Sequence, residues 1–455
     1  MTYIICSRTL DCVTARNLEL ICNIVDPHSN HSLYGVLNNT FTPMGARLLR
    51  TNILQPLNGS DLKHSSQFKQ VTTSRGFKHS NLIFVIHVAL KPFQDIDHLI
   101  TALIQVPQKP SIKHAEQSIN NVIMLKHTLK LIEKLREALS GCKNLLCAIH
   151  KFLSDPRLTM LEERINEVIN EDITYQKSSL GLRNQRCYAV KTLATRQTYK
   201  ETVNDIYKKV EQYNKQYDIP LKIQFSPTTG FYLSISVEHL GERQLPLVFI
   251  NVSKKKKTLT FTTLELMKKN TKINDSLTEV YLMSDKTIED LILEIRGSIA
   301  VFYKASESIA MLDMLTSFAH QCTVSNYVRP EFTDTLAIKD GRHPMREFLY
   351  TDHFVPNDTY ASDATNFQLI TGPNMSGKST YLRQIALMNI MSQLGSFVPA
   401  EYASFRLVDQ LFTRICNDNN IETNASTFIV EMRETAYILQ NITDNSLVII
   451  DELGR

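Results

Sequence analysis

Residues 372–379 form the stretch Gly-Pro-Asn-Met-Ser-Gly-Lys-Ser, which fits the pattern G-x-x-x-x-G-K-[ST] at every fixed position. An apolar run over residues 367–370 precedes it, and an apolar helical pattern over residues 379–394 follows it. A glycine turn between a strand and a helix lets backbone N–H groups and the helix N-terminus face phosphate oxygens. The stretch therefore predicts an α/β domain with a P-loop. A glycine turn without a ligand is the alternative interpretation.

The residue types of this loop suit a nucleoside triphosphate bound with Mg²⁺. The Lys378 ammonium would reach the β- and γ-phosphates, and the Ser379 hydroxyl would ligate the metal. The nucleotide-binding residues that the motif predicts are Gly372, Pro373, Asn374, Met375, Ser376, Gly377, Lys378, Ser379 and Thr380.

A second element of the same chemistry lies some 70 residues later. Residues 447–452 read Leu-Val-Ile-Ile-Asp-Glu, a buried-strand pattern that ends in two carboxylates. Asp451 would hold Mg²⁺ through water, and Glu452 would orient or deprotonate the attacking water. The pair favours hydrolysis over transfer to a small acceptor. A strand that ends in a solvated acidic turn is the alternative.

Composition places the chain among folded proteins of several domains. Its 455 residues suggest about three domains. The 43% hydrophobic and 21% charged residues argue against disorder, and the net charge of +4 is only a weak indication of anionic partners. None of the eight cysteines forms a C-x-x-C pair, and the apolar run over residues 82–90 is too short to span a bilayer. We expect a cytoplasmic or nuclear protein.

The first 195 residues predict a helical core domain. Apolar spacing predicts helices around residues 18–24 and 43–54, and a long helix over residues 112–139. Residues 57–80 are polar and aperiodic and predict a loop.

A change of period marks an inserted β module. An amphipathic helix over residues 196–217 is followed by four alternating stretches, and helical periodicity returns over residues 284–319, about 50 Å of helix. This order predicts a long arm with a β tip. The predicted strands are 221–225, 231–237, 247–252 and 258–263, and the predicted segments are 1–195, 196–285 (outgoing helix and β module), 286–330 (returning helix) and 331–455 (P-loop domain).

The turn of the last hairpin carries a run of lysines, Lys254, Lys255, Lys256 and Lys257. Such a tip can meet phosphates and would add affinity and salt dependence without reading sequence. A solvated turn or a nuclear-targeting stretch is the alternative. Elsewhere, Phe354 could stack on adenine or belong to the core, and His343 suits a structural role better than a catalytic one.

Several of these stretches resemble those of MutS-type ATPases, which clamp DNA as dimers. Residues 371–381 (TGPNMSGKSTY) resemble the P-loop of that family, residues 426–432 (STFIVEM) its signature, and residues 451–455 (DELGR) its Walker B element. Residues 10–20 and 341–344 also match. Ser376, together with residues 327–337, is most similar to the meiotic branch of the family.

The resemblance implies a multidomain α and α/β fold. A long-helix lever and core domain with an inserted β-rich clamp would precede a P-loop ATPase domain of the ABC type. Ser426 would act in trans on the γ-phosphate beside Lys378 and Glu452, and Phe354 and Asn357 would lie at the adenine.

The implied function is an ATP-dependent clamp on mismatched or branched DNA, in particular meiotic recombination intermediates such as Holliday junctions. The implied cofactors are ATP and Mg²⁺. The implied partners are double-stranded or branched DNA and a second MutS homologue, the fifth, in a heterodimer. We expect a nuclear protein on chromosomes, without a membrane.

The chain also departs from the family pattern. It shows no mismatch-reading Phe-x-Glu domain before residue 1, and it stops just past the Walker B element. The segment 57–95 is atypical, because it lacks the arginine-leucine-aspartate helix that the resemblance implies there. We therefore expect an incomplete ATPase domain with weak turnover, and whether this chain is an enzyme stays open. The alternative is a fragment that binds DNA or a partner without hydrolysis. A P-loop enzyme for a small substrate would not need the basic-tipped arm.

Overall fold

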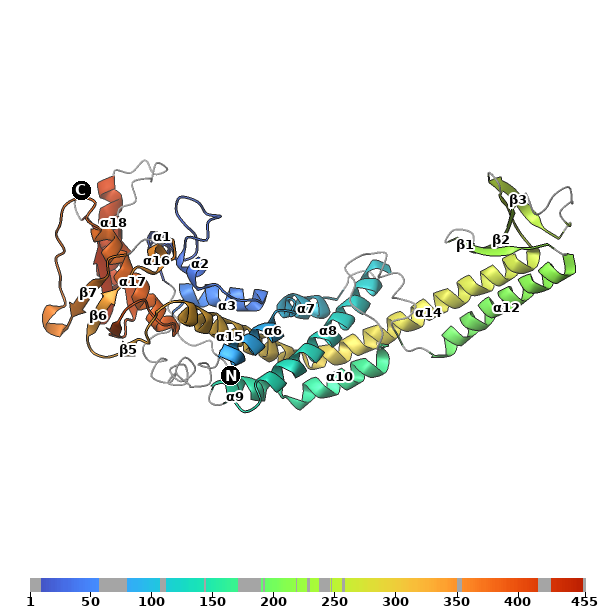
Figure 1. The fold of residues 1–455 in the computed structure, drawn as a ribbon, viewed down its shortest axis with the longest axis horizontal. Helices are drawn as coiled ribbons and strands as arrows, with labels where there is room; N and C mark the ends of the chain where they lie inside the picture. Colours follow the sequence, from blue (N-terminus) through green and yellow to red (C-terminus); the bar gives the residue numbers. More distant parts are fainter. Residues whose placement is uncertain are drawn as a thin grey trace. The chain divides into compact units, whose positions relative to one another are not determined.

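The computed structural model describes residues 10–56, 80–106, 112–142, 145–170, 190, 193–217, 219–226, 230–236, 246, 248–255, 258–349, 354–415 and 427–452. The chain divides into two compact units (Figure 1). The first comprises Met1–Ile100, Thr128–Leu158 and Ala300–Arg455, and the second comprises Thr101–His127 and Thr159–Ile299. The predicted polar loop at 57–80 lies outside the described residues except for Ser80.

Helices α2, α3 and α15 of the first unit share one apolar core. Helix α15 supplies buried Met314 and Phe318, and the N-terminal segment supplies buried leucines such as Leu18 and Leu33. Because α15 buries residues on most of its circumference, it forms the centre of this unit. The helices with residues here are α1 (Cys12–Asn17), α2 (Leu33–Leu37), α3 (Pro43–Leu54), α6 (Ser80–Leu90), α7 (Ile96–Ile104), α8 (Ile112–Ala138), α9 (Leu145–Leu153), α10 (Pro156–Val168) and α15 (Ile299–Val324).

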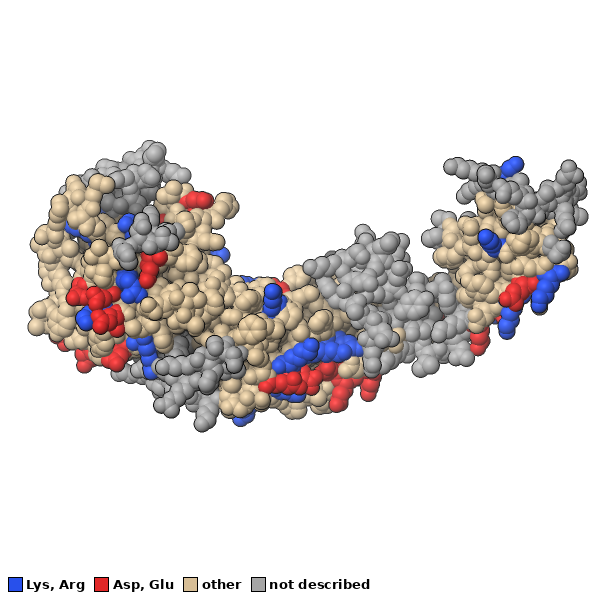
Figure 2. All heavy atoms as spheres, viewed as in Figure 1, with Lys and Arg blue, Asp and Glu red and all other residues tan. Residues whose placement is uncertain are grey.

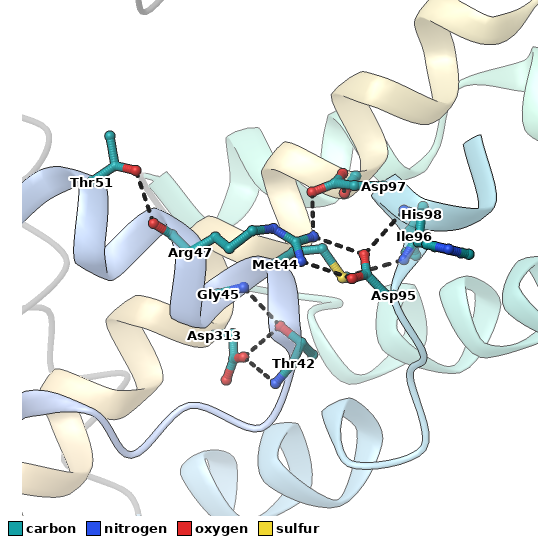
Figure 3. Close-up of polar contacts among 11 residues, drawn as sticks. Thr42, Met44, Gly45, Arg47, Thr51, Asp95, Ile96, Asp97, His98 and Asp313 are labelled. Atoms are coloured by element: carbon teal, nitrogen blue, oxygen red, sulfur yellow. Dashed lines mark hydrogen bonds and ion pairs between the residues drawn. The ribbon is translucent and has the colours of Figure 1, made fainter. Parts of the chain in front are cut away.

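A buried carboxylate of α15 fixes the start of α3 (Figure 3). Asp313 accepts hydrogen bonds from the backbone N–H groups of Phe41 and Thr42, the latter at 2.7 Å, and from the Thr42 hydroxyl at 2.6 Å. Burial raises the pKa of the Asp313 carboxyl. At Gly45 a Cβ atom would lie 2.4 Å from Asp313 Oδ2, so a side chain there would displace the carboxylate. The sequence Thr42-Pro43-Met44-Gly45 therefore starts helix α3 and also forms its contact with Asp313 of α15.

An exposed ion cluster joins α3 to the first turn of α7 (Figure 3). Arg47 lies 2.7 Å from both Asp95 and Asp97, and the Ser306 hydroxyl of α15 donates to Asp97 at 2.6 Å. The guanidinium lowers the pKa of the Asp95 carboxyl. Since Arg47 is half exposed, this cluster contributes mainly orientation and about 1 kcal/mol or less per pair.

The C-terminal part of the first unit is α/β. A four-stranded sheet has the order β5-β8-β6-β7, and a second sheet pairs β9 with β10 in parallel. Helix α17 is buried from its second turn to its end. The elements are β5 (Glu331–Phe332), β6 (Leu336–Gly341), α16 (Pro344–Leu349), β7 (Asn357–Ala361), η1 (Asp363–Thr365), α17 (Lys378–Leu394), β8 (Tyr402–Phe405), β9 (Gln410–Arg414), α18 (Thr427–Asn441) and β10 (Ser446–Ile450).

The strand predicted at residues 367–370 does not form. Phe367 and Leu369 are 85% and 81% exposed. A strand needs a neighbouring backbone for its N–H and C=O groups, and residues 367–370 belong to none of the described strands. The Gln368 amide instead donates to the carbonyl of Tyr360. The prediction was wrong because an apolar run becomes a buried strand only where a neighbouring strand pairs with it.

The second unit contains the β module, an antiparallel sheet of order β1-β2-β4-β3 packed on two helices. Its core contains Ile206, Leu233, Phe261 and Leu266. The predicted helix–sheet–helix order is confirmed, with a strand shifted: the third runs to Lys255 instead of ending at residue 252. The elements are α12 (Leu193–Tyr217), β1 (Lys222–Ser226), β2 (Gly230–Ser236), β3 (Ile250–Lys255), β4 (Thr258–Thr262) and α14 (Leu264–Gly297).

One asparagine fastens the sheet to α14. The Asn270 amide accepts from the backbone N–H of Phe231 at 3.0 Å and donates to its carbonyl at 2.8 Å, as a neighbouring strand would. Gly230 has φ +73°, and a Cβ there would lie 2.9 Å from Asn270 Cγ. Glycine at this position thus allows both the turn and the contact.

Two predicted helices have different limits. The returning helix begins at Leu264 and is interrupted at Ser298, between α14 and α15, where Gly297 weakens the helix. The helical spacing around residues 18–24 does not produce a helix, because α1 ends at Asn17 and Glu19 adopts φ +50°.

Candidate nucleotide-binding site

The glycine loop ends where α17 begins. Gly377 is the N-cap residue with φ +94°, which glycine adopts without strain, and Lys378 is the first helical residue. Met375 also has positive φ, 62°, and its side chain is fully exposed. The loop side chains from Thr371 to Gly377 are exposed, as is Ser379 in the first turn. The helix N-terminus and its N–H groups therefore face solvent, as anion binding requires.

The Lys378 ammonium folds back over the loop. It donates to the carbonyl oxygens of Gly372 at 2.8 Å and Pro373 at 2.9 Å. Phosphate oxygens would compete with these two carbonyls for the same donor, and they would form the stronger, charge-assisted bonds. The lysine is thus placed to reach a phosphate on the loop.

Asp451 follows β10 directly and continues its parallel pairing. Its N–H donates to the carbonyl of Arg414 at 2.8 Å, and its side chain is buried. Glu452 is exposed and has φ +54°. Within the described part of the chain, no hydrogen bond or ion pair joins Lys378 to Asp451.

Arg414, at the end of β9, connects the Walker B strand to α18. Its guanidinium lies 3.6 Å from Glu431 Oε2 and 3.7 Å from Glu434 Oε2, and Nη1 lies 3.5 Å from the Asp451 carbonyl oxygen. The side chains of Arg414 and Glu431 are 8% and 1% exposed. Burial raises the pKa of the Glu434 carboxyl, although Arg414 opposes the shift. We name Arg414, Glu431 and Glu434 the Arg414 cluster.

The sequence reasoning missed the Arg414 cluster. Its signal was an arginine inside the apolar run Leu411-Phe412-Thr413-Arg414-Ile415, because a charge in a buried strand requires a buried partner. Glu431 lies within the predicted signature stretch 426–432, but its partner could not be identified from spacing.

Helix α1 covers the free edge of β9 beside this cluster. The N–H of Thr413 donates to the Thr14 hydroxyl at 3.0 Å, and the Asn17 amide donates to the Thr413 carbonyl at 3.2 Å. Both backbone groups of one edge residue are thus satisfied by side chains of a helix almost 400 residues earlier. The arrangement anchors the N-terminal segment along β9, the strand that pairs with the Walker B strand β10.

The predicted base-binding residues lie at the start of β7: Phe354 precedes the strand by three residues, and Asn357 is its first residue. Phe354 and Asn357 are half-buried, and the Asn357 amide donates to the Val355 carbonyl at 3.3 Å. Strand β7 in turn contacts α17, because the Tyr381 hydroxyl lies 3.0 Å from the Thr359 hydroxyl. The structure thus places the segment 354–357 on a strand that contacts the P-loop helix.

His343 has a structural role in this unit, as the sequence suggested. It is 3% exposed, and its Nδ1 accepts from the Arg346 N–H at 3.3 Å. Burial, followed by the charges of Arg346 and Arg383, lowers the pKa of the imidazole to about 3. The folded protein therefore holds this histidine neutral.

We expect acid to destabilise the fold through His343. The unfolded chain protonates the imidazole near its ordinary pKa of about 6.5, so stability from this residue is complete above that pH and falls toward pH 3. Between about pH 7.5 and 5.5 the free energy of unfolding should fall by about 1.4 kcal/mol. Urea unfolding of the protein and of His343→Gln at each pH measures this: the difference between them should shrink by that amount. A pH-independent difference would contradict it.

Several predicted site residues fall partly or wholly outside the described residues. Lys254 is exposed on β3, and the backbone of Lys255 pairs with Thr258. Lys256, Lys257, Ser426 and residues 453–455 are not described. Figure 2 shows acidic and basic side chains side by side on the helices below the β module, where Lys209 pairs with Glu265 and Lys269 with Asp205. These helices therefore offer phosphates a mixed surface.

The described residues show neither a metal-binding cluster nor a membrane-spanning helix. No group of three or more His, Cys, Asp or Glu side chains could hold a metal ion in that part of the chain. None of the described helices combines the length and apolar character needed to cross a membrane.

Comparison with known families identifies two domains. Residues 13–319 match the model of MutS domain III, and residues 368–455 match that of MutS domain V. Together these matches include most of the helices, the β module, the glycine loop and the Walker B strand.

Individual relatives agree with the family models. MutS protein homolog 4 of Homo sapiens is 45% identical over 98% of this chain and 48% of the human protein. MutS protein homolog 4 of Saccharomyces cerevisiae is 36% identical over 98% of the chain and 51% of the yeast protein. The DNA mismatch repair protein MutS of Fervidobacterium nodosum is 30% identical over 98% of the chain and 52% of the bacterial protein. The chain thus spans about half the length of the curated relatives it matches.

Proposed function

The chain belongs to the MutS family, and from this premise we propose that it is an ATP-controlled DNA-binding clamp. The observation that carries the proposal is the glycine loop at the start of α17, with Lys378 held over it, in a chain that matches MutS domains III and V. A nucleotide site and a helix-borne β module then belong to one molecule, as a nucleotide-switched clamp needs.

The proposed nucleotide is ATP with Mg²⁺. Residues 372–380 would bind the phosphates, Ser379 and Asp451 would hold the metal, and Glu452 would orient the attacking water. Phe354 and Asn357 would contact the adenine. Ser426 would complete the site of a partner subunit. Binding without hydrolysis is the alternative, and single-turnover assays with radiolabelled ATP separate the two.

The proposed DNA contact is the hairpin of β3 and β4. Its lysines would bind backbone phosphates irrespective of sequence, so the preferred DNA would be selected by shape. Similarity to MutS protein homolog 4 from human and yeast supports a meiotic role, with branched recombination intermediates such as Holliday junctions as the DNA. We further propose a heterodimer with the fifth MutS homologue and a nuclear location.

Replacing Lys254–Lys257 by alanine should test the clamp directly. The dissociation constant for DNA should rise on every sequence alike, and the slope of log affinity against log salt should flatten by about 1 for each lysine that contacts a phosphate. Fluorescence anisotropy with a four-way junction and a linear duplex, across a salt series, measures both. Alanine at Lys268 and Lys272, exposed on α14, provides a matched control. An unchanged slope in the hairpin variant would show that DNA binds elsewhere.

A further inference from the structure

Tyr381 connects the two halves of the candidate nucleotide site. It lies three residues after Lys378 on α17, so the two side chains share a face of the helix. Its hydroxyl accepts from the Thr359 hydroxyl at 3.0 Å and donates to the Asp358 carbonyl at 3.3 Å. Both partners lie on β7, immediately after Asn357. One side chain thus bridges the phosphate-binding helix and the strand that carries the segment 354–357.

The strand end that Tyr381 contacts is itself well fixed. Thr359 is 5% exposed and pairs with Ile338 of β6, and Asn357 pairs with Gly341 in the same ladder. The position of β7 therefore depends on two sets of contacts. Tyr381 connects it to α17, and backbone pairing connects it to β6. Loss of the hydroxyl would remove this direct contact between β7 and α17, while the pairing of β7 with β6 and the helix itself would stay in place.

We propose that Tyr381 is a positioning residue that sets the spacing between the base-binding segment 354–357 and the P-loop. A whole nucleotide must contact both parts, whereas a bare phosphate chain needs only the N-terminus of α17. Tyr381 therefore selects adenosine triphosphate over inorganic polyphosphate. This inference rests on the proposed nucleotide site and adds to it the residue that joins its two parts.

The test compares two ligands on the full chain. Calorimetric titration with Mg²⁺ and either ATP or inorganic tripolyphosphate gives their dissociation constants for the protein and for Tyr381→Phe. Loss of these hydrogen bonds should weaken ATP about fivefold and leave tripolyphosphate unchanged within about twofold. Thr359→Val, which removes the partner hydroxyl, should reproduce the effect. Tyr360→Phe, at a tyrosine 59% exposed on the same strand, is the matched control.

A double-mutant cycle tests whether Tyr381 acts through the base contact. In a Phe354→Ala background, Tyr381→Phe should not weaken ATP affinity further, because the aromatic ring that Tyr381 would position is already absent. Equal weakening of ATP and tripolyphosphate would overturn the proposal in favour of a role in the P-loop alone, as would unchanged ATP affinity in Tyr381→Phe. If the unaltered protein bound neither ligand, the nucleotide site itself would be refuted, and this proposal with it.

Discussion

Lys378→Ala should raise the dissociation constant for ATP by about 10- to 150-fold. The lysine ammonium is free to exchange its bonds with the Gly372 and Pro373 carbonyls for phosphate oxygens. A hydrogen bond to a charged group contributes about 1.5–3 kcal/mol, and the variant loses it. Calorimetric titration with ATP and Mg²⁺ measures the change.

A matched lysine makes this result interpretable. Lys304 is exposed on α15, outside the P-loop, and Lys304→Ala removes the same charge. ATP affinity should stay within about twofold in this control. An ATP affinity that Lys378→Ala leaves unchanged would mean that the glycine loop does not hold the triphosphate.

The second large effect is on stability. Arg414→Met should lower the free energy of unfolding by about 3 kcal/mol, because it removes the guanidinium that lies 3.6 Å from the buried Glu431 carboxylate. Urea unfolding followed by far-UV circular dichroism measures it, a suitable probe because the chain contains no tryptophan. Helix α18 should also lose its anchor to the Walker B strand.

An exposed arginine–carboxylate pair in the same unit provides the comparison. Arg406 lies 2.5 Å from Asp363, with side chains 43% and 79% exposed, so Arg406→Met should cost about 1 kcal/mol or less. Adding Glu431→Gln to Arg414→Met should restore part of the loss, since the buried negative charge beside residue 414 is then removed. Equal costs for Arg406→Met and Arg414→Met would show that burial does not decide the energetics of the Arg414 cluster.

Local periodicity predicted the elements whose burial is one-sided. Helix α12 and three strands of the β module lie within a few residues of where the pattern indicated, whereas β3 is shifted by three residues. In each case the side chains that face the core recur at the period of the element, so the sequence itself carries the signal. The family motifs added the chemistry, which periodicity cannot supply.

The contacts that the sequence could not predict join residues far apart in the chain. Asp313 contacts Thr42 across 271 residues, and Thr413 contacts Thr14 across 399. The local sequence around a polar side chain does not indicate which distant residue it will contact. The same reason explains the error at residues 367–370, where the predicted strand has no neighbouring strand. It also explains why the partners of Arg414 could not be predicted.

The most direct test of an ATP-controlled clamp is whether nucleotide changes DNA affinity. Anisotropy titrations of the chain onto a four-way junction, with and without ATP and Mg²⁺, give the two dissociation constants. We predict a difference of about fivefold or more that disappears in Lys378→Ala, since coupling between two sites typically lies in that range. Identical DNA affinities with and without a saturating concentration of ATP would contradict the account.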